Sequence, residues 1–382
     1  MNRKLNTKVG ILGGGQLGKM LGIAASPWHL PISFMDPAPH PPVKGYVPNL
    51  IQGSLDDKND ILNFGLSNDV VSIEIEHIHI DALYELEKRG IEVYPQPEVL
   101  EMIQDKGLQK EFYALHNFPT SPFQLITNKN ELLGKLNAGT LNFPFVQKLR
   151  KGGYDGKGVL IVQSSSGIKK LFDAPSVIEH LVPIKKEIAI IGARNKNGDF
   201  KAFPPVEMEF NPQANLVEFL SCPANMTTNQ SQQATSIVEA LMKKSNIVGL
   251  LAVEFFLTDE DKLLINEIAP RPHNSGHHTI ESCTTSQFEQ HLRSILNLPL
   301  GNTETLSPSI MLNLLGKEGY YGTPIFDGID KVLALEGVHV HIYGKTSTQP
   351  FRKMGHVTIT APTLQQARDQ AQKVKTLLKV IA

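Results

Sequence analysis

A glycine-rich strand-turn-helix pattern near the start of the chain constrains the fold more than any other feature. The apolar stretch Val9–Leu12 runs directly into Gly13-Gly14-Gly15, and an amphipathic helix is expected from Gln16 to Ala25. A second apolar stretch, Ile32–Met35, follows and ends at Asp36. A strand, a tight turn, a helix and another strand in this order predict a parallel sheet, so we expect an α/β domain first.

The same turn carries a candidate phosphate site. Gly13-x-Gly15-x-x-Gly18, with Asp36 about 20 residues further on, is the dinucleotide-binding fingerprint, and its glycines let the backbone approach a phosphate at a helix N-terminus. Taken alone, the motif suggests an NAD-dependent oxidoreductase. It also fits another phosphate-bearing ligand or a purely structural turn, so the motif by itself leaves three interpretations open.

Length and charge narrow the class of protein. A chain of 382 residues is too long for one ordinary core and indicates two or three domains. The net charge of −1 argues against nucleic acid or a membrane surface as a partner, because such binders favour strongly basic patches. No run approaches the roughly 18 apolar residues of a membrane span. Because the two cysteines, Cys222 and Cys283, also fit a reducing compartment, we expect a cytoplasmic protein.

The alternation of strand and helix changes after the first third of the chain. A strand is predicted over 70–76, a helix over 81–89 and a helix-rich connector over 98–117. From residue 143 the chain becomes rich in strands, so an α+β region follows the α/β domain. The elements expected there are strands over 143–149, 158–162, 177–182, 187–193 and 200–206, a helix over 230–245, strands over 249–257 and 263–269, and two more strands and a terminal helix within 337–382.

A glycine-rich loop joins two of these strands. Four glycines in the seven residues Gly152-Gly153-Tyr154-Asp155-Gly156-Lys157-Gly158 keep the loop flexible and its amides free, and Lys148 lies near the end of the preceding strand. A β-hairpin of this kind can fold over a triphosphate and exclude water. It is not a Walker loop, because Gly-Lys-Ser/Thr is missing and a strand follows instead of a helix. The alternative is a mobile surface hairpin.

The strongest chemical signal is a pair of glutamates on adjacent strands. The polar turn Thr258–Lys262 joins two apolar strands, and if Thr258 pairs with Leu263, Glu254 lies directly opposite Glu267. Two opposed carboxylates at ~5 Å repel each other unless a cation lies between them or one is protonated. Mg²⁺ held by both carboxylates and by nucleotide oxygens meets this requirement. A register slip of one residue would separate the pair.

Two basic segments follow the glutamate pair. Arg271-Pro272-His273-Asn274-Ser275-Gly276-His277-His278 has no helical or strand period, and an arginine beside a metal-bound phosphate suits an acyl-phosphate-like species. The three histidines lack a second ligand cluster with zinc spacing, so zinc is disfavoured. Arg352 and Lys353 precede a strand and are predicted to clamp a phosphate, with a solvated basic turn as the alternative.

In this order the motifs resemble the ATP-grasp superfamily and, within it, the N5-carboxyaminoimidazole ribonucleotide synthetase family of purine biosynthesis. The resemblance covers nearly the whole chain. Besides the first turn and the loop over 152–158, it rests on Asn266-Glu267-Ile268-Ala269-Pro270-Arg271-Pro272-His273-Asn274-Ser275-Gly276-His277, on Ser286-Gln287-Phe288-Glu289 and on Arg352-Lys353-Met354-Gly355-His356. The family implies a Rossmann-like pre-ATP-grasp domain over 1–104, an ATP-grasp lid subdomain with a helical connector over 105–187, an ATP-grasp central domain over 188–300, and a small β-rich C-terminal domain over 301–382.

The resemblance also implies an activity. In this family ATP phosphorylates bicarbonate to carboxyphosphate, and this intermediate, or the CO₂ that it releases, carboxylates the exocyclic amine of 5-aminoimidazole ribonucleotide. ADP and phosphate are the other products. The implied cofactors are ATP and Mg²⁺, the implied partners are these small molecules and a second copy of the chain in a homodimer, and neither nucleic acid nor a membrane is expected.

The site residues that the family implies form four groups. ATP is expected at basic residues, at the loop, at a hinge for the adenine and at an acceptor for the ribose: Lys106, Lys148, Gly152, Gly153, Tyr154, Asp155, Gly156, Lys157, Gly158, Glu179, His180, Leu181, Val182, Glu187, Asn266 and Glu267. The ribonucleotide is expected at Gln16, Leu17, Glu76, Tyr154, Arg271, His273, Asn274, Ser275, Arg352 and Lys353. Glu254 and Glu267 would hold Mg²⁺, and Asp155, Arg271 and Lys353 are the implied catalytic residues.

Two departures from the wider superfamily bear on the metal and the phosphates. Many ATP-grasp enzymes carry Glu-x-Asn in the metal strand, whereas Glu267 is followed by Ile268 and Ala269, so a second metal has one expected ligand fewer. Lys106 keeps the charge of an arginine but not its bidentate geometry. A formate-dependent glycinamide ribonucleotide transformylase, an NAD-dependent oxidoreductase and a non-catalytic nucleotide-binding module are the alternative functions.

Overall fold

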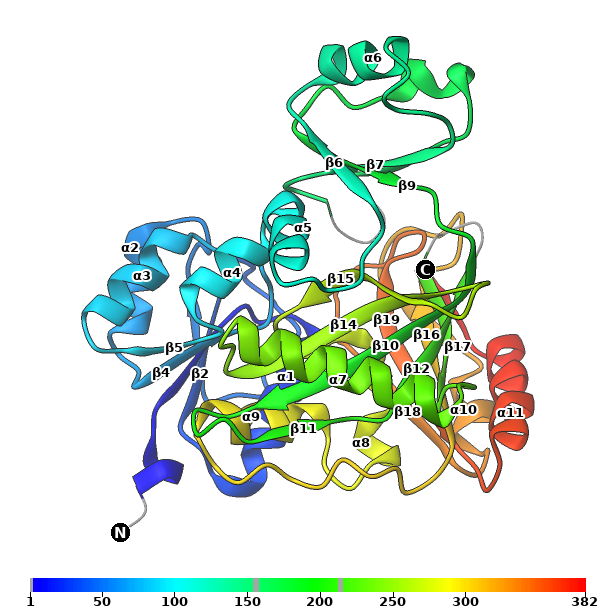
Figure 1. Cartoon of the computed structure of the whole chain (residues 1–382). Helices are drawn as coiled ribbons and strands as arrows, with labels where there is room; N and C mark the ends of the chain where they lie inside the picture. The colour runs from blue at the N-terminus through cyan, green and yellow to red at the C-terminus, as the bar shows by residue number, and fades with distance from the viewer. Residues whose placement is uncertain (1–2, 154–157, 212–215) are drawn as a thin grey trace.

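The structure, a computed structural model, describes residues 3–153, 158–211 and 216–382. These residues form four β-sheets with helices packed against them (Figure 1). The first sheet is parallel, with five strands in the order β3-β2-β1-β4-β5, which confirms the predicted α/β start of the chain. In that order the strands are Asn49–Gln52, Ile32–Asp36, Val9–Leu12, Val70–Ile73 and Glu92–Tyr94.

Helices cover the first sheet and connect it to the rest of the molecule. All residues of β1 and β4 are buried, as expected for parallel strands with both faces covered. Helix α1 (Gln16–Ala25) packs against α9 (Gln287–Ile295), and the two share one apolar cluster with β1 and β2. The remaining helices of this region, which pack on each other, are α2 (Lys58–Gly65) and α3 (Ile80–Lys88).

The strand predicted over 70–76 is shorter than expected. β4 ends at Ile73, so Glu74 and Glu76 lie beyond the carboxyl end of the strand instead of within the ladder. In open parallel sheets this edge is where ligands bind. The early end of β4 therefore places two acidic side chains at the edge that also carries the glycine-rich turn.

A helical connector leads from the first sheet to a separate lobe. It consists of α4 (Pro97–Ile103) and α5 (Lys106–Leu115), and Asp105 caps α5 by accepting the Gly107 amide at 2.8 Å. The lobe holds an antiparallel sheet in the order β6-β9-β7-β8 and helix α6 (Lys129–Asn137), and Figure 1 shows it above the rest of the molecule. Its strands in that order are Phe123–Ile126, Ser176–His180, Phe145–Leu149 and Val159–Val162.

The largest sheet of the described residues has nine strands, all paired antiparallel. Eight follow the order β15-β14-β10-β12-β13-β16-β19-β18, and β11 pairs with β10. In that order, with β11 last, they are Leu263–Ala269, Gly249–Thr258, Ile184–Arg194, Val206–Asn211, Leu216–Cys222, Ser309–Leu315, Lys353–Thr360, Val338–Ile342 and Phe200–Ala202. Helices α7 (Thr228–Lys244) and α8 (Thr279–Ser282) accompany this sheet.

Two predictions for this part of the chain are wrong in detail. The single strand predicted over 200–206 is two strands, β11 and β12, because Pro204 and Pro205 between them cannot donate to a ladder. The chain also continues beyond the predicted terminal helix α11 (Leu364–Leu377) into β20 (Lys379–Ile381). β20 pairs with β17 (Ile325–Asp327) in a small sheet near α10 (Ile329–Leu333).

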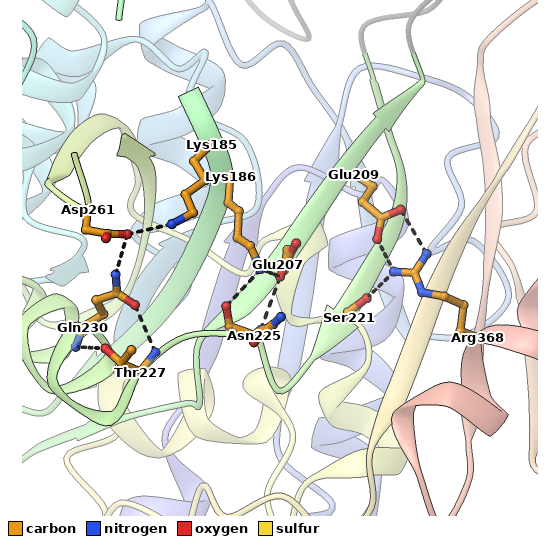
Figure 2. Close-up of polar contacts among 10 residues, drawn as sticks. All are labelled: Lys185, Lys186, Glu207, Glu209, Ser221, Asn225, Thr227, Gln230, Asp261 and Arg368. Carbon is orange, nitrogen blue, oxygen red and sulfur yellow. Dashed lines mark hydrogen bonds and ion pairs between the residues drawn. The ribbon is translucent and has the colours of Figure 1, made fainter. Parts of the chain in front are cut away.

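Ion pairs attach α11 and the hairpin turn to the large sheet. Arg368 on α11 binds both carboxylate oxygens of Glu209 on β12 and lies 3.1 Å from Ser221 Oγ (Figure 2). Lys185 on β10 lies 2.9 Å from Asp261 in the turn between β14 and β15. The first contact joins α11 to β12 and β13, and the second joins β10 to the turn of the hairpin β14-β15. None of the described helices has the length and apolar character needed to cross a membrane.

Candidate active site

Three carboxylates lie on one face of the large sheet, on neighbouring strands. Glu254 on β14 is directly opposite Glu267 on β15 and, on its other side, opposite Ala189 on β10. Glu187 precedes Ala189 by two residues, so its side chain points to the same face. The predicted opposition of Glu254 and Glu267 is confirmed, and Glu187 extends the acidic face to a third strand.

A β-bulge at Asn266 produces this alignment. Near the turn the register differs from the predicted one by one residue, because Leu263 pairs with Leu257 and not with Thr258. Asn266 is then an extra residue between two paired ones, and beyond it the register is the predicted one. If the register near the turn continued without the bulge, Asn266 and not Glu267 would lie opposite Glu254.

Burial and neighbouring charges shift the pKa values of the three carboxylates. Burial is the main cause that raises the pKa of Glu254, and the neighbouring charges of Glu267 and Glu187 raise it further. Burial also raises the pKa of Glu187, to about 7. The pKa of Glu267 is lowered, chiefly because Lys106 Nζ lies 2.8 Å from its Oε2. The Glu267 side chain is still 47% exposed, so this acidic face is open to a ligand cation.

Basic side chains from the connector and the lobe reach the acidic face. Lys148 Nζ on β7 lies 2.9 Å from Asn266 Oδ1 and 3.1 Å from one oxygen of Glu179 on β9. Lys110 Nζ on α5 lies 3.0 Å from the other oxygen of Glu179. Lys110 was not among the predicted site residues, although it follows Lys106 by one helical turn and therefore lies on the same side of α5. A network with two lysines on one glutamate thus links the lobe to α5.

Arg271 connects the large sheet to the first sheet. Its Nε lies 2.8 Å from Glu76 Oε1, beyond the end of β4, and its side chain is 20% exposed. Arg271 also acts electrostatically on Glu267 and Glu74. The structure therefore brings the predicted residues Glu76 and Arg271 together at the junction of the two sheets.

His273 and Ser275 form a second connection to the acidic face. His273 Nε2 lies 3.6 Å from Glu254 Oε1, and its Nδ1 lies 2.9 Å from Ser275 Oγ. Asn274, in contrast, donates to Asn313 Oδ1 on β16 at 2.9 Å. Asn274 therefore serves to attach this segment to the large sheet in the structure.

The two predicted clamp residues behave differently. Lys353 begins β19, and its charge lowers the pKa of Glu254, so it lies within electrostatic reach of the acidic face. Arg352 Nη1 donates to the backbone oxygen of Ser347 at 2.8 Å and to its Oγ at 2.9 Å. The structure thus brings Lys353 to the site and engages Arg352 within its own loop.

The amides of the glycine-rich turn donate to carboxylates. The Gly14 amide lies 2.7 Å from Asp36 Oδ2, the Gly15 amide 2.7 Å from Glu74 Oε1, and the Gly18 amide 3.0 Å from Glu74 Oε2. These are the donors that a dinucleotide pyrophosphate would need. The structure therefore does not support the dinucleotide interpretation of this motif. Gln16 and Leu17, the other predicted residues here, are the first two residues of α1.

The remaining predicted ATP residues lie in the loop and the hinge. Tyr154, Asp155, Gly156 and Lys157 are outside the described residues. Of their neighbours, Gly152 and Gly158 have φ angles of 78° and 80°, a conformation that favours glycine over other residues, and Gly153 lies between Gly152 and the undescribed segment. The segment 179–182 leads from β9 in the lobe to β10 in the large sheet. This segment includes His180, Leu181 and Val182, and through it the chain passes from the lobe to the large sheet.

Known families match most of the chain. Residues 111–288 match the ATP-grasp domain, residues 6–104 the ribonucleotide synthetase preATP-grasp domain, and residues 309–370 the phosphoribosylaminoimidazole carboxylase C-terminal domain. Together with the acidic hairpin beneath a lysine-bearing lobe, these matches define an ATP-grasp protein. The NAD-dependent oxidoreductase is therefore excluded as the class of this chain.

Relatives and solved structures resolve the family further. The N5-carboxyaminoimidazole ribonucleotide synthase of Bacillus subtilis is 35% identical over 92% of this chain and 90% of its own length. The N5-carboxyaminoimidazole ribonucleotide synthetase structure from Thermotoga maritima has a TM-score of 0.90 and 39% identity, and covers 98% of this chain and 99% of its own. The chain belongs to the N5-carboxyaminoimidazole ribonucleotide synthase family.

A liganded structure and longer relatives complete the comparison. The Aspergillus clavatus N5-carboxyaminoimidazole synthase, in complex with ADP and 5-aminoimidazole ribonucleotide, has a TM-score of 0.89 and 30% identity, and covers 98% of this chain and 99% of its own. The chain spans only 64% and 65% of the length of two curated relatives, from Vigna aconitifolia and Candida glabrata, that are named phosphoribosylaminoimidazole carboxylase.

Proposed function

We propose that the protein is a ligase that uses ATP to carboxylate the exocyclic amine of 5-aminoimidazole ribonucleotide with bicarbonate. The products are N5-carboxyaminoimidazole ribonucleotide, ADP and phosphate. The observation that carries this proposal is the opposition of Glu254 and Glu267 beside Lys106, because a cation bound by two carboxylates next to a lysine suits a nucleotide triphosphate. Membership of the family supplies the acceptor and the carbon source.

The proposed reaction has two steps. A bicarbonate oxygen attacks the γ-phosphorus of ATP, the bond from this phosphorus to the bridging oxygen breaks, and ADP leaves. The product is carboxyphosphate, a mixed anhydride. The exocyclic amine then forms a bond to the carboxyl carbon of this anhydride, or to the CO₂ that it releases, while phosphate departs and the amine nitrogen loses a proton.

Glu254 and Glu267 fit a bound Mg²⁺. Their carboxylates face each other from adjacent strands, and the pKa of Glu254 is raised by burial and by the charge of Glu267, which a cation would relieve. Among the described residues no three acidic, histidine or cysteine side chains form a metal cage, so the other ligands would be nucleotide oxygens and water. When bound, Mg²⁺ would neutralise the charge that develops on the transferred phosphoryl group.

The chain's own residues would bind and orient ATP around this cation. Lys106 and Lys148 supply positive charge for the phosphate oxygens, and Asn266 is bonded to Lys148 at the bulge. Glu187 would accept the ribose hydroxyls, and residues 179–182 would receive the adenine between the lobe and the large sheet. The loop over 152–158, with Tyr154, Asp155, Gly156 and Lys157, would cover the phosphates and exclude water.

The ribonucleotide would bind at the junction of the first sheet and the large sheet. Arg271 and Glu76 are paired there, and Lys353 is within electrostatic reach of Glu254. Arg271 would stabilise the bicarbonate-derived anion, and Lys353 would bind the ribonucleotide. The other proposed contacts are Gln16, Leu17, Tyr154, Asp155, His273, Asn274, Ser275 and Arg352.

The proposal extends to the organisation of the protein. We assign the pre-ATP-grasp domain to residues 1–104, the lid subdomain with its connector to 105–187, the central domain to 188–300 and the C-terminal domain to 301–382. The family resemblance supports a homodimer, and the low net charge and two cysteines support a cytoplasmic location.

Phosphate release from ATP tests the proposed function. The rate should rise strongly when 5-aminoimidazole ribonucleotide is added to enzyme, MgATP and bicarbonate, and this stimulation should disappear when bicarbonate is removed. Stimulation by formate and glycinamide ribonucleotide would instead identify a transformylase. If neither pair of substrates stimulates release, the protein is a nucleotide-binding module without this activity.

A further inference from the structure

The glycine-rich turn is filled from within the protein. Glu74 comes from beyond the end of β4, 59 residues away from Gly15 in sequence, and its residue is 8% exposed. One of its carboxylate oxygens accepts the Gly15 amide and the other accepts the Gly18 amide. A carboxylate held by two amides at a helix start occupies the position where a phosphate binds in nucleotide-binding turns.

The glycines of the turn make room for Glu74. A Cβ atom on Gly13 would lie 2.5 Å from Glu74 Cγ, and a Cβ atom on Gly15 would lie 2.6 Å from Glu74 Oε1. Both distances are too short for any side chain, so the turn needs glycine at these two positions to admit the Glu74 side chain. The close approach that the motif normally offers to a ligand phosphate is used here by a residue of the chain itself.

The acidic residue of the fingerprint is also engaged internally. Asp36 accepts the Gly14 amide through Oδ2 and the Ala38 amide through Oδ1, at 2.7 Å and 2.8 Å. In dinucleotide-binding proteins this acidic residue receives the ribose hydroxyl. The Gly14, Gly15 and Gly18 amides and the Asp36 carboxylate, which would bind the phosphates and the ribose of a dinucleotide, therefore all have partners within the protein.

Two amides at the start of α1 remain. Gln16 and Leu17 are the first two residues of the helix, and within the part of the chain that the structure describes neither backbone N–H has an acceptor. They lie between the two amides that Glu74 binds. The first N–H groups of a helix have no partner within the helix, so the position of these two amides depends on how Glu74 holds the turn.

We propose that Glu74 is a built-in anion that fills the phosphate cradle of the turn and so determines which ligand the turn accepts. It closes the turn to the pyrophosphate of a dinucleotide, and by binding the Gly15 and Gly18 amides it fixes the start of α1, where Gln16 and Leu17 lie, in the position that the ribonucleotide site requires. Glu74 is thus a positioning and specificity-determining residue. The positioning role rests on the function proposed above, in which Gln16 and Leu17 contact the ribonucleotide.

Removing the Glu74 side chain should open the cradle to free anions. Glu74→Ala is compared with the unchanged protein by thermal unfolding in excess inorganic phosphate and in chloride of equal ionic strength. We expect phosphate to raise the unfolding temperature of the variant by about 3 °C more than that of the unchanged protein. Equal phosphate shifts in the two proteins would overturn the proposal. This measurement needs no turnover, so it stands even if the proposed reaction is wrong.

Glu74→Gln tests the positioning role and keeps the side-chain volume. Its amide NH₂ group would face one of the two N–H donors, so the helix start should shift and the KM for the ribonucleotide should rise about tenfold, with the KM for ATP within about twofold. The control is Asp57→Asn, which alters a carboxylate that caps α2 in the same domain by accepting two amides at 2.8 Å and 3.0 Å. A Glu74→Gln enzyme with an unchanged ribonucleotide KM, or with both KM values raised equally, would contradict the proposal.

Discussion

Loss of the Glu179 charge should strongly destabilise the junction between the lobe and α5. Its two carboxylate oxygens bind Lys110 and Lys148 at 3.0 Å and 3.1 Å, and the three side chains are 3%, 4% and 11% exposed. Glu179→Gln keeps the volume and removes the charge. Two buried ammonium groups would then lose the carboxylate that both of them bind.

The expected loss follows from the burial of both lysines. Removing one partner of a buried ion pair costs about 3–5 kcal/mol, because the remaining charge stays buried without compensation. Lys110→Met should cost less, since it leaves Lys148 and Glu179 as a neutral pair. We therefore expect Glu179→Gln to lose much more stability than Lys110→Met. A change in side-chain shape alone would give the opposite order, because methionine differs from lysine in shape more than glutamine differs from glutamate.

The loss should also depend on pH in a defined direction. Burial is the largest cause that lowers the pKa of Lys110, to about 8 in the folded protein, and Glu179 opposes this effect. In the Glu179→Gln variant the pKa of Lys110 in the folded state falls further below 8. At any pH between this lower pKa and 8, the unfolded variant therefore binds more protons than the folded variant. Its stability then rises with pH by up to about 1.4 kcal/mol per unit, while the contribution of Lys110 to the unchanged protein stays flat.

Urea unfolding followed by circular dichroism from pH 6 to pH 8 measures both effects. We expect the free-energy deficit of Glu179→Gln to be largest at the acidic end and to shrink toward pH 8. A deficit below about 1 kcal/mol, or one as small as that of Lys110→Met, would show that the lysines are not held as a buried network. A deficit that grows with pH would refute the assigned direction of the Lys110 pKa.

Three further variants test other parts of the site. Glu267→Gln should reduce turnover at least about 100-fold with little change in unfolding temperature, because it removes charge but not volume from a half-exposed side chain. The control is Glu260→Gln, in the turn of the same hairpin. A near-normal kcat of Glu267→Gln would exclude Glu267 as a metal ligand. Lys353→Ala should raise the KM for the ribonucleotide about tenfold and spare that for ATP, and an unchanged value would remove it from the substrate site. Arg368→Leu should cost about 1 kcal/mol of unfolding free energy and leave both KM values unchanged, because α11 packs on the face of the large sheet opposite the acidic side chains. Altered kinetics would show that α11 influences the site.

The local parts of the fold could be predicted from the sequence. β1 and α1 have the predicted bounds, because a buried apolar stretch, a glycine turn and an amphipathic period coincide there. The opposition of Glu254 and Glu267 was also predictable, since a short hairpin limits the register. The prediction depended on two offsets that cancel: a longer turn than expected and the bulge at Asn266. The sequence pattern of the strand does not predict such a bulge.

Contacts between distant segments could not be predicted. Glu74 reaches the turn at Gly15 only because β4 lies beside β1 in the parallel sheet, and that order is a property of the whole fold. Strands β13 and β16 were not predicted at all, and they complete the large sheet by pairing segments about 90 residues apart. Lys110 is different, because its position one turn after Lys106 was visible in the sequence.

The central claim is that a bicarbonate oxygen attacks the γ-phosphorus of ATP. Bicarbonate labelled with oxygen-18 tests it directly, by mass spectrometry of the phosphate released during turnover with 5-aminoimidazole ribonucleotide. The account predicts that each phosphate formed carries one labelled oxygen, because the oxygen that bonds to phosphorus stays with it when the anhydride breaks. Product formation with unlabelled phosphate would contradict the account, since the phosphoryl group would then have passed to water or to another acceptor.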